Sequence, residues 1–464
     1  MSEIVLRLQV RFRTFLLKEI CMNIQLSEHF TYRKLLKFTF PSMVMMVFTS
    51  IYGVVDGVFV SNFVGKDPFA AVNLIMPFLM ILGALGFMIG SGGSALVATT
   101  MGTGDEKKAN GIFSMLIYVL IGFGLVFMVL GIVFLEPVTR ILGADEVLLP
   151  YCMTYGRIIL LAMVPFMLQN VFQSFLVTAE RPDLGLYVTI AAGVTNMVLD
   201  ALFIAVFKMG IAGAALATVI SQYIGGVVPL LYFVLPNKGK LHLGKAAWKM
   251  RNLIKACTNG ASEFMTNISM SIVTMLYNWQ LMRLMGSDGV TIYGIIMYVD
   301  FIFVGILLGY SMGSAPIVSY HYGAGNQDEL KGLFKRSLRL IVSMNVILMV
   351  SAEVLSRPLS MIFVSYNAEL LDMTTMAFRI YAISFLLMGI NIYASSFFTA
   401  LNDGKISALI SFCRTLIFEC ASVLILPIIL GINGIWGAII LAELAAAALS
   451  AFCFIRYAGK YGYV

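Results

Sequence analysis

Charged residues are scarce in this chain of 464 residues. Asp, Glu, Lys and Arg together make up 12% of it, whereas apolar residues make up 60%. The mean hydropathy of +0.93 is far above that of soluble proteins. Apolar segments of about 20 residues recur about a dozen times, and each could cross a hydrocarbon layer about 30 Å thick. The composition therefore excludes an ordinary soluble domain and predicts an all-α polytopic membrane protein.

Motifs of enzymatic chemistry are also missing. The sequence has no GxSxG, Walker A or HExxH pattern, and its three histidines (His29, His242 and His321) are isolated. The 6 cysteines are scattered without CxxC spacing, so they indicate neither a disulfide framework nor a metal site. We therefore expect no enzyme and no resident cofactor. Without a nucleotide-binding loop, an ion gradient is the energy source that remains for transport.

Basic charge is the one excess, with a formal net charge of +7. If residues 1–37 lie inside and twelve spans follow, the inner segments hold most of the basic residues, including six between Lys238 and Lys255. This asymmetry is the positive-inside rule, so it sets topology and does not indicate a nucleic acid partner. It predicts a multi-pass protein of a bacterial-type plasma membrane with both termini in the cytoplasm. The outer loops hold only Lys66, Arg140, Lys208, Arg283, Arg357 and Arg379.

The expected organisation has four parts. They are a cytoplasmic N-terminal arm (1–37), a first lobe (38–235), a polar cytoplasmic linker (236–255) and a second lobe (256–464). Residues 1–21 of the arm are expected to be dispensable to the fold. The expected spans are 38–62, 72–100, 109–135, 151–178, 186–207 and 211–235, followed by 256–284, 291–320, 334–356, 376–400, 406–428 and 433–457.

The chain matches itself when it is shifted by 221 residues. Gly65-Lys66-Asp67 then falls on Gly286-Ser287-Asp288, and Gly102-Thr103-Gly104 falls on Gly323-Ala324-Gly325. One shift holds over most of the chain, which indicates a duplicated unit. Six spans per unit is an even number, so the two lobes are expected to be parallel and related by a pseudo-two-fold axis along the membrane normal.

Four polar residues of the first copy are replaced in the second copy by one tyrosine and three apolar residues. Asp56, Asn196, Asp200 and Thr218 fall on Tyr277, Ile417, Ala421 and Ile439. From the expected spans, Asp56, Asp200 and Thr218 share one depth, about 10 Å below the outer surface. Asn196 and Asp200 are four residues apart, so they share a helix face.

Two carboxylates close together in a low dielectric repel each other. Such a pair either shares a proton or is neutralised by a hard cation with oxygen ligands. Intramembrane carboxylates are costly and commonly functional. We therefore predict a cation-coupling site for H⁺ or Na⁺ at these four residues, which are its metal ligands if the ion is Na⁺. A structural role, in which the acids cap or bond within the lobe, is the alternative.

The second lobe has ionisable residues elsewhere. Arg414 and Glu419 are five residues apart, which is poor spacing for a pair on one helix, so we expect a structural ion pair somewhere in the lobe rather than coupling. Glu263 begins the seventh span near the inner surface, where a helix-terminus role is expected and a functional role is the secondary hypothesis. Asp300 and Glu443 are two further acids of this lobe.

Several stretches of the chain resemble the multidrug and toxic compound extrusion (MATE) family over residues 35–458. They include the stretches that carry Asp56, Asn196, Asp200 and Thr218. The stretches are Pro41 with Ser50-Ile-Tyr-Gly-Val-Val-Asp56, Asn196-Met-Val-Leu-Asp200, Gly210-Ile-Ala-Gly-Ala-Ala-Leu-Ala-Thr218, Tyr322-Gly-Ala-Gly325 and Gly431-Ile-Asn-Gly-Ile-Trp-Gly437.

The resemblance implies a twelve-helix, two-lobed antiporter that exports organic, often cationic, compounds against inward Na⁺ or H⁺ flow. The first-lobe set is similar to that of the DinF-like branch. The NorM-type branch instead uses a Glu deeper in helix seven and an Asp in helix ten. Here the helix-seven position is near Met270 and the tenth span carries no acid.

Cation-coupled drug export by alternating access is therefore the leading hypothesis, with small organic molecules and the lipid bilayer as partners and a monomer as the working unit. A flippase for a lipid-linked or polyisoprenoid substrate is the alternative, although such proteins tend to line the cavity with basic residues. A channel or a non-transporting receptor ranks next, and a membrane-embedded enzyme ranks last.

Overall fold

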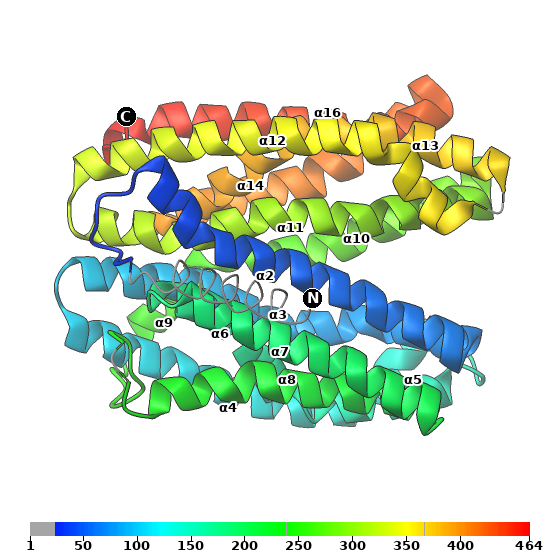
Figure 1. The fold of residues 1–464 in the computed structure, drawn as a ribbon, viewed down its shortest axis with the longest axis horizontal. Helices are drawn as coiled ribbons and strands as arrows, with labels where there is room; N and C mark the ends of the chain where they lie inside the picture. The colour runs from blue at the N-terminus through cyan, green and yellow to red at the C-terminus, as the bar shows by residue number, and fades with distance from the viewer. Residues whose placement is uncertain (1–23, 238, 366) are drawn as a thin grey trace, which may run out of the picture.

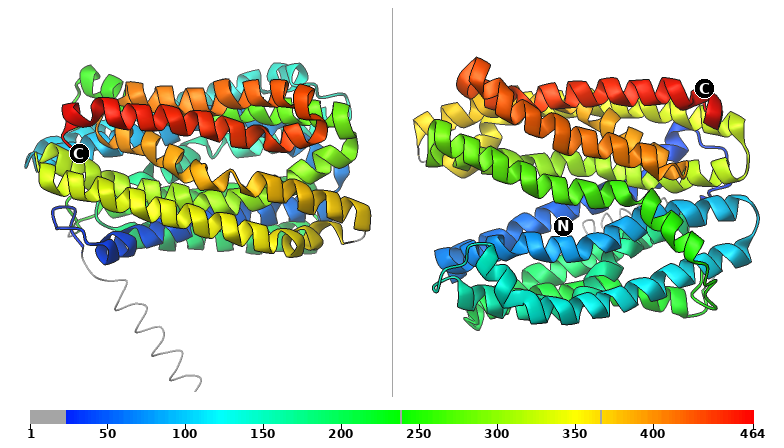
Figure 2. Two further views of the ribbon diagram at one scale, coloured as in Figure 1. Left: turned by 90° about the horizontal axis from the view of Figure 1, so that it is seen from above. Right: turned by 180° about the vertical axis from the view of Figure 1, so that it is seen from behind.

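The structure is a computed structural model that describes residues 24–237, 239–365 and 367–464, and these residues form helices and no strands. Residues 1–21, expected to be dispensable, lie outside the described part. The helices run nearly parallel to one long axis and gather in two groups, with helix α2 lying along the boundary between them (Figure 1). The view from behind shows the same two groups (Figure 2).

The first lobe is built from long apolar helices, because a backbone in lipid must satisfy its hydrogen bonds within the segment. Two short π-helical segments, η1 and η2, interrupt the regular α-helical pattern at the ends of the first and fifth spans. The elements in chain order are α2 (Tyr32–Phe59), η1 (Val60–Val64), α3 (Lys66–Gly102), α4 (Glu106–Ile141), α5 (Leu149–Leu160), α6 (Met163–Thr178), α7 (Pro182–Asp200), η2 (Ala201–Val206) and α8 (Gly210–Val234).

The second lobe repeats this order after the linker. Its first span is preceded by a short separate helix, α9 (Met250–Asn259), which is capped by Gly260, so the span begins five residues later than expected. The other elements are α10 (Ala261–Met285), α11 (Ser287–Gly323), α12 (Gln327–Val364), α13 (Ala368–Ala382), α14 (Phe385–Ala400), α15 (Gly404–Phe412), η3 (Cys413–Phe418) and α16 (Glu419–Tyr461).

The 221-residue repeat is visible in the helix ends. Helix α3 spans Lys66–Gly102 and α11 spans Ser287–Gly323, so both ends differ by that shift. The N-caps follow it too: the side chain of Asp105 accepts the amide of Lys108 at the start of α4, and that of Asn326 accepts the amide of Glu329 at the start of α12. These caps satisfy amides that a helix start leaves without partners.

The fourth span of each lobe is broken at the matching place. Helices α5 and α6 form one span bent by 59°, and α13 and α14 form one bent by 48°. Eight other stretches of the described residues are long and apolar enough to cross a membrane. The last of these, Gly404–Tyr461, divides at Gly431, whose φ is 58°. Helix α10, with 25 residues and a more polar sequence, completes the twelve spans of the two six-helix lobes.

Each lobe has its own hydrophobic core. One cluster of buried side chains runs from Val60 to Ala256 and the other from Val273 to Ile439. At one end of the bundle the lobes touch where α3 approaches α11: a Cβ added at Gly323 would lie 2.0 Å from the backbone oxygen of Thr99. We call this end of the bundle, which also carries the Leu235–Lys249 loop, the linker end.

A strap formed by residues Ile24–Thr31 also joins the lobes at the linker end. The backbone N–H of Leu26 donates to Glu180 Oε1 of the first lobe at 2.8 Å, and that of Phe30 donates to Glu329 Oε1 of the second lobe at 2.9 Å. Both carboxylates are paired, with Lys240 (2.9 Å) and Arg336 (2.8 Å) respectively. The strap therefore has one polar anchor on each lobe.

Candidate functional site

Two acids of the first lobe lie where regular helix gives way to π-helix. Asp56 lies in the last turn of α2, just before η1, and Asp200 is the last residue of α7, immediately before η2. A π-helical segment is uncommon and is found frequently at functional sites, because the extra residue per turn disturbs the regular hydrogen bonds. The backbone therefore departs from regular helix one turn after Asp56 and immediately after Asp200.

The four predicted residues share one unusual property, which is a buried polar atom without a hydrogen-bond partner. Asn196 is 2% exposed and Asp200 is fully buried. Leaving such a group without a partner costs about 1–3 kcal/mol, and more for a charge. The atoms concerned are Asp56 Oδ1, Asn196 Oδ1, Asp200 Oδ1 and Oδ2, and Thr218 Oγ1.

The structure brings these residues together. Helix α7 packs against both α2 and α8, which carry Asp56 and Thr218. The two carboxylates lie close enough to interact with each other, and the phenol of Tyr155 lies near both of them and near the hydroxyl of Thr218. Asn196 lies one turn before Asp200 on α7. The cluster thus holds two carboxylates, an amide and a hydroxyl from three helices.

No basic side chain neutralises this cluster among the ion pairs of the described residues. The described part of the chain also holds no group of three or more His, Cys, Asp or Glu residues that could bind a metal ion. Two carboxylates and neutral oxygens are instead suited to a proton or to a hard monovalent cation.

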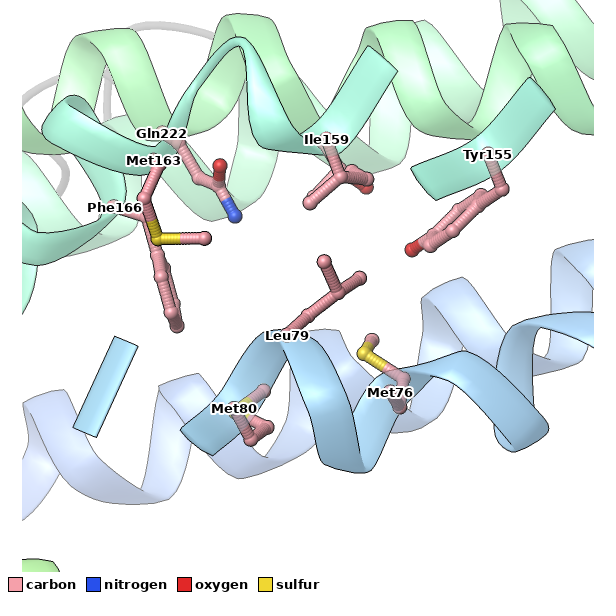
Figure 3. A pocket seen from close by; sticks show the side chains of 9 residues that line it. Met76, Leu79, Met80, Tyr155, Ile159, Met163, Phe166 and Gln222 are labelled. Atoms are coloured by element: carbon pink, nitrogen blue, oxygen red, sulfur yellow. The ribbon is translucent and has the colours of Figure 1, made fainter. Parts of the chain in front are cut away.

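A small cavity of about 30 Å³ lies beside the cluster, between α3, α5, α6 and α8. Thr218 and Tyr155 line it on the polar side, and Figure 3 shows the Tyr155 hydroxyl and the Gln222 amide turned toward Leu79. The remaining lining is apolar and rich in methionine, which adapts to varied shapes. The other lining residues are Met76, Met80, Ile159, Met163 and Phe166.

Sequence reasoning missed Tyr155 and Gln222. Tyr155 is one of 20 tyrosines, and nothing in the sequence distinguishes it from those in the core. Gln222 could have been identified from the sequence, because it lies four residues after Thr218 and therefore shares its helix face. It is 9% exposed and its Oε1 has no partner, as for the four predicted residues.

The second-lobe residues lie apart from this cluster. Glu263 is half-buried in the first turn of α10, and its functional role stays a prediction. Arg414 pairs with Glu443 of α16, with its Nε at 2.8 Å and its Nη2 at 2.7 Å from Glu443 Oε1. The lobe thus contains an ion pair of the expected kind, with Glu443 rather than Glu419 as the partner of Arg414.

Two six-helix lobes with buried carboxylates between membrane-spanning helices are the architecture of a class of two-lobed membrane transporters. Within that class the chain belongs to the MatE family, because the MatE family model matches residues 41–202 and 264–422, which together make up more than half of the chain.

Relatives and solved structures agree with this membership. The chain is 23% identical over 407 residues to the multidrug export protein MepA of Staphylococcus saprophyticus, which covers 88% of each chain. It is 23% identical over 430 residues to MepA of Staphylococcus haemolyticus, which covers 92% of this chain and 93% of that protein.

The fold matches that of solved MATE proteins. A MATE protein crystallised in complex with MaL6 superimposes with a TM-score of 0.89, at 18% identity and with 94% of this chain and 98% of that chain covered. An outward-facing multidrug resistance MATE transporter of the MOP superfamily superimposes with a TM-score of 0.88 at 19% identity, with the same coverage.

Proposed function

We propose that this protein exports small organic compounds, many of them cationic, in exchange for H⁺ or Na⁺ that enters through the first lobe. The observation that carries the proposal is the cluster of Asp56, Asn196, Asp200 and Thr218, whose buried oxygens have no partners in the described protein. The multidrug export function of the MepA relatives supports the substrate class. The DinF-like character of the protein is proposed on the same four residues.

A coupling ion has a defined task at such a cluster. Two ionised carboxylates in a low dielectric destabilise the packing of α2 against α7, and each buried charge carries a desolvation cost of several kcal/mol. Binding of one positive charge removes most of that cost and lets the helices close. The first lobe therefore has two packing states, and the bound ion decides between them.

The methionine-lined cavity gives the ion a way to act on a substrate. Thr218 and Tyr155 belong to both the ion cluster and the cavity wall, so a change of packing at the carboxylates changes the shape of the cavity. Ion binding and substrate binding then oppose each other, as antiport requires. One charge that crosses 100 mV releases about 2.3 kcal/mol, which sustains a gradient of about 50-fold for a neutral substrate.

The state of the lobes is consistent with this cycle. They are packed together at the linker end, which the charge distribution predicts to be cytoplasmic, so the described conformation keeps that side closed. The alternative of a lipid-linked substrate gains no support, because the relatives reported above are drug exporters.

Efflux of a cationic dye from energised cells tests the proposal. We expect Asp56→Asn and Asp200→Asn each to reduce efflux at least tenfold while leaving membrane insertion unchanged. Glu136→Gln is the matched control, because Glu136 lies in the same lobe with an exposed side chain. Collapse of efflux with a protonophore alone identifies H⁺, and collapse with a Na⁺ ionophore alone identifies Na⁺. An active Asp56→Asn variant would refute the proposal.

A further inference from the structure

Helix α9 has an exposed face that carries apolar and cationic side chains next to each other. Met250 and Ile254 are four residues apart, and so are Arg251 and Lys255, so the two pairs form neighbouring rows on one side of the helix. All four residues are exposed. Trp248, just before the helix, is 69% exposed. Exposed apolar side chains that gather beside charges mark an interaction surface, so this face needs a partner.

The cations of this face have no acidic partner. Arg251, Lys255 and the nearby Lys108 form none of the ion pairs of the described residues. Lys108 is held close by the linker, because the backbone N–H of Ala247 donates to the backbone oxygen of Gly111 in the same helix, α4, at 2.9 Å. Partial burial, and then the charges of Arg251 and Lys108, lower the pKa of Lys255. Three positive charges that repel one another favour an anion as the partner.

The position of α9 along the bundle places this face in the headgroup layer. Helix α3 has 37 residues and is about 55 Å long, so it extends beyond a hydrocarbon core of about 30 Å by about 12 Å at each end. The side chain of Asn259, the last residue of α9, donates to the backbone oxygens of Gly92 at 3.4 Å and Thr399 at 2.9 Å. Gly92 lies about 15 Å before the end of α3 at Gly102, and α9 is itself about 15 Å long. Most of α9 therefore lies beside the part of α3 that leaves the hydrocarbon, at the linker end (Figure 1).

The apolar row decides between a lipid and a dissolved anion. A free phosphate, a nucleic acid or an acidic protein would neutralise the cations, but it would leave Trp248, Met250 and Ile254 in water. Tryptophan is enriched in the headgroup layer, where lysine and arginine place their stems along apolar groups and their charges in the polar region. A phospholipid supplies both the phosphate and the acyl chains that such a face requires.

We propose that the exposed face of α9 binds anionic phospholipids in the leaflet at the linker end. The headgroup contacts Arg251, Lys255 and Lys108, and the acyl chains cover the three apolar side chains. Because Asn259 joins α9 to both lobes, the bound lipid acts on the helix that connects them. The site does not depend on the coupling ion or on the exported compound.

The fluorescence of Trp248 tests the proposal, since bromine on a lipid chain quenches a tryptophan that it touches. The chain has 3 tryptophans, so Trp279→Phe/Trp436→Phe leaves Trp248 alone in the full-length protein. If that variant does not fold, the difference between the wild type and Trp248→Phe gives the same quantity. The vesicles contain phosphatidylcholine and phosphatidylglycerol in equal amounts, with bromine on the chains of one lipid or of the other. The overall composition is then identical, and the lipid that contacts Trp248 is the one variable.

We expect brominated phosphatidylglycerol to quench more strongly, with a preference of about fivefold for the anionic lipid, which is the effect of about one cation near an anionic membrane surface. Equal quenching by the two lipids would show that the face does not select for charge. Quenching by neither lipid would place Trp248 in water. Either result overturns the proposal and leaves the proposed export function untouched.

Removal of the cationic row separates a specific site from general surface charge. Arg251→Gln/Lys255→Gln is expected to reduce the preference at Trp248 to nearly one. Lys331→Gln/Lys335→Gln is the matched control, because it removes two cations with the same spacing near the start of α12, at the same end of the bundle. We expect this control to keep the preference. Equal losses in the two variants would assign the effect to the overall charge of the linker end and refute a site on α9.

Discussion

The Arg414–Glu443 pair gives the sharpest stability prediction, because each partner can be removed alone or together. Glu443 has a 2% exposed side chain and accepts two hydrogen bonds from the guanidinium and one from Asn391. Arg414→Met leaves Glu443 with the Asn391 amide as its one remaining donor. Removal of one partner of a buried pair typically costs about 3–5 kcal/mol, and the electrostatic influence of Asp300 and Glu419 on Arg414 places this case toward the upper end.

The double variant Arg414→Met/Glu443→Leu is expected to behave differently. Replacement of a buried pair by apolar side chains of similar volume is often neutral or stabilising. Asn391 loses its carboxylate partner, but its amide still donates to the backbone oxygen of Glu443 at 3.0 Å, and its Oδ1 still accepts from Ser450. We therefore expect the double variant to lie within about 2 kcal/mol of the wild type, so that the two substitutions are strongly non-additive.

Thermal unfolding of the purified protein measures this, with all four proteins heated at one scan rate because membrane proteins commonly unfold irreversibly. The single variants Arg414→Met and Glu443→Leu should both melt well below the wild type, and the double variant should recover most of the difference. A double variant that melts as low as the sum of the two single effects would show that the pair does not couple, and the reasoning from burial would then be wrong.

Three further outcomes follow from contacts at the linker end. Gly323→Ala, whose Cβ would lie 2.0 Å from the backbone oxygen of Thr99, should lower the melting temperature and loosen the lobe contact, whereas Gly294→Ala, which meets nothing within 4 Å, should do neither. Glu180→Ala removes a charge-assisted bond worth about 1.5 kcal/mol, so hydrogen exchange at the Leu26 amide should rise about tenfold, and an unchanged rate would contradict the strap. Asp403 lies in the turn before α15; burial would raise its pKa, but hydrogen bonds from Tyr461 and Lys460 outweigh burial and lower it. Its stabilisation is therefore complete above about pH 4 and lost as the pH falls through the lower folded-state pKa, so the protection factors of amides near the C-terminus should fall in acid in the wild type but not in Asp403→Asn.

Much of the fold could be predicted from the sequence, because a membrane leaves the chain few options. A backbone in lipid must form helices, so long apolar runs locate the spans directly. The duplication then gave the number and direction of the spans in each lobe. What the apolar pattern could not show is where a span bends: the 59° bend between α5 and α6 lies within one continuous hydrophobic run. The separate helix α9 was missed for a related reason, since its polar face resembles a loop.

The first-lobe cluster could be proposed from the sequence because its acids are conspicuous in an apolar chain. Tyr155 could not be proposed from the sequence, since a tyrosine in a span is ordinary and its place beside the cluster depends on how α5 packs against α8. The ion pair of the second lobe was harder still. The repeat shows that Ile417, Ala421 and Ile439 replace the polar residues of the first copy, but the charges of the second lobe lie at other positions, and the pairing of Arg414 with Glu443 across 29 residues needs the tertiary structure.

The strap indicates which contacts must break when the linker end opens. Ile24, Leu26 and Phe30 belong to a hydrophobic cluster made mainly of second-lobe side chains, including Tyr310 and Phe397. Leu26 and Phe30 are fully buried, so release of the strap from the second lobe would expose both side chains, at about 1.5–3 kcal/mol each. Its hold on the first lobe is instead the bond from Leu26 to Glu180, worth about 1–2 kcal/mol. The strap also continues directly into α2 of the first lobe, so it cannot leave that lobe altogether. Since the weaker contact yields first, we expect the bond to Glu180 to break before Leu26 and Phe30 leave the second lobe.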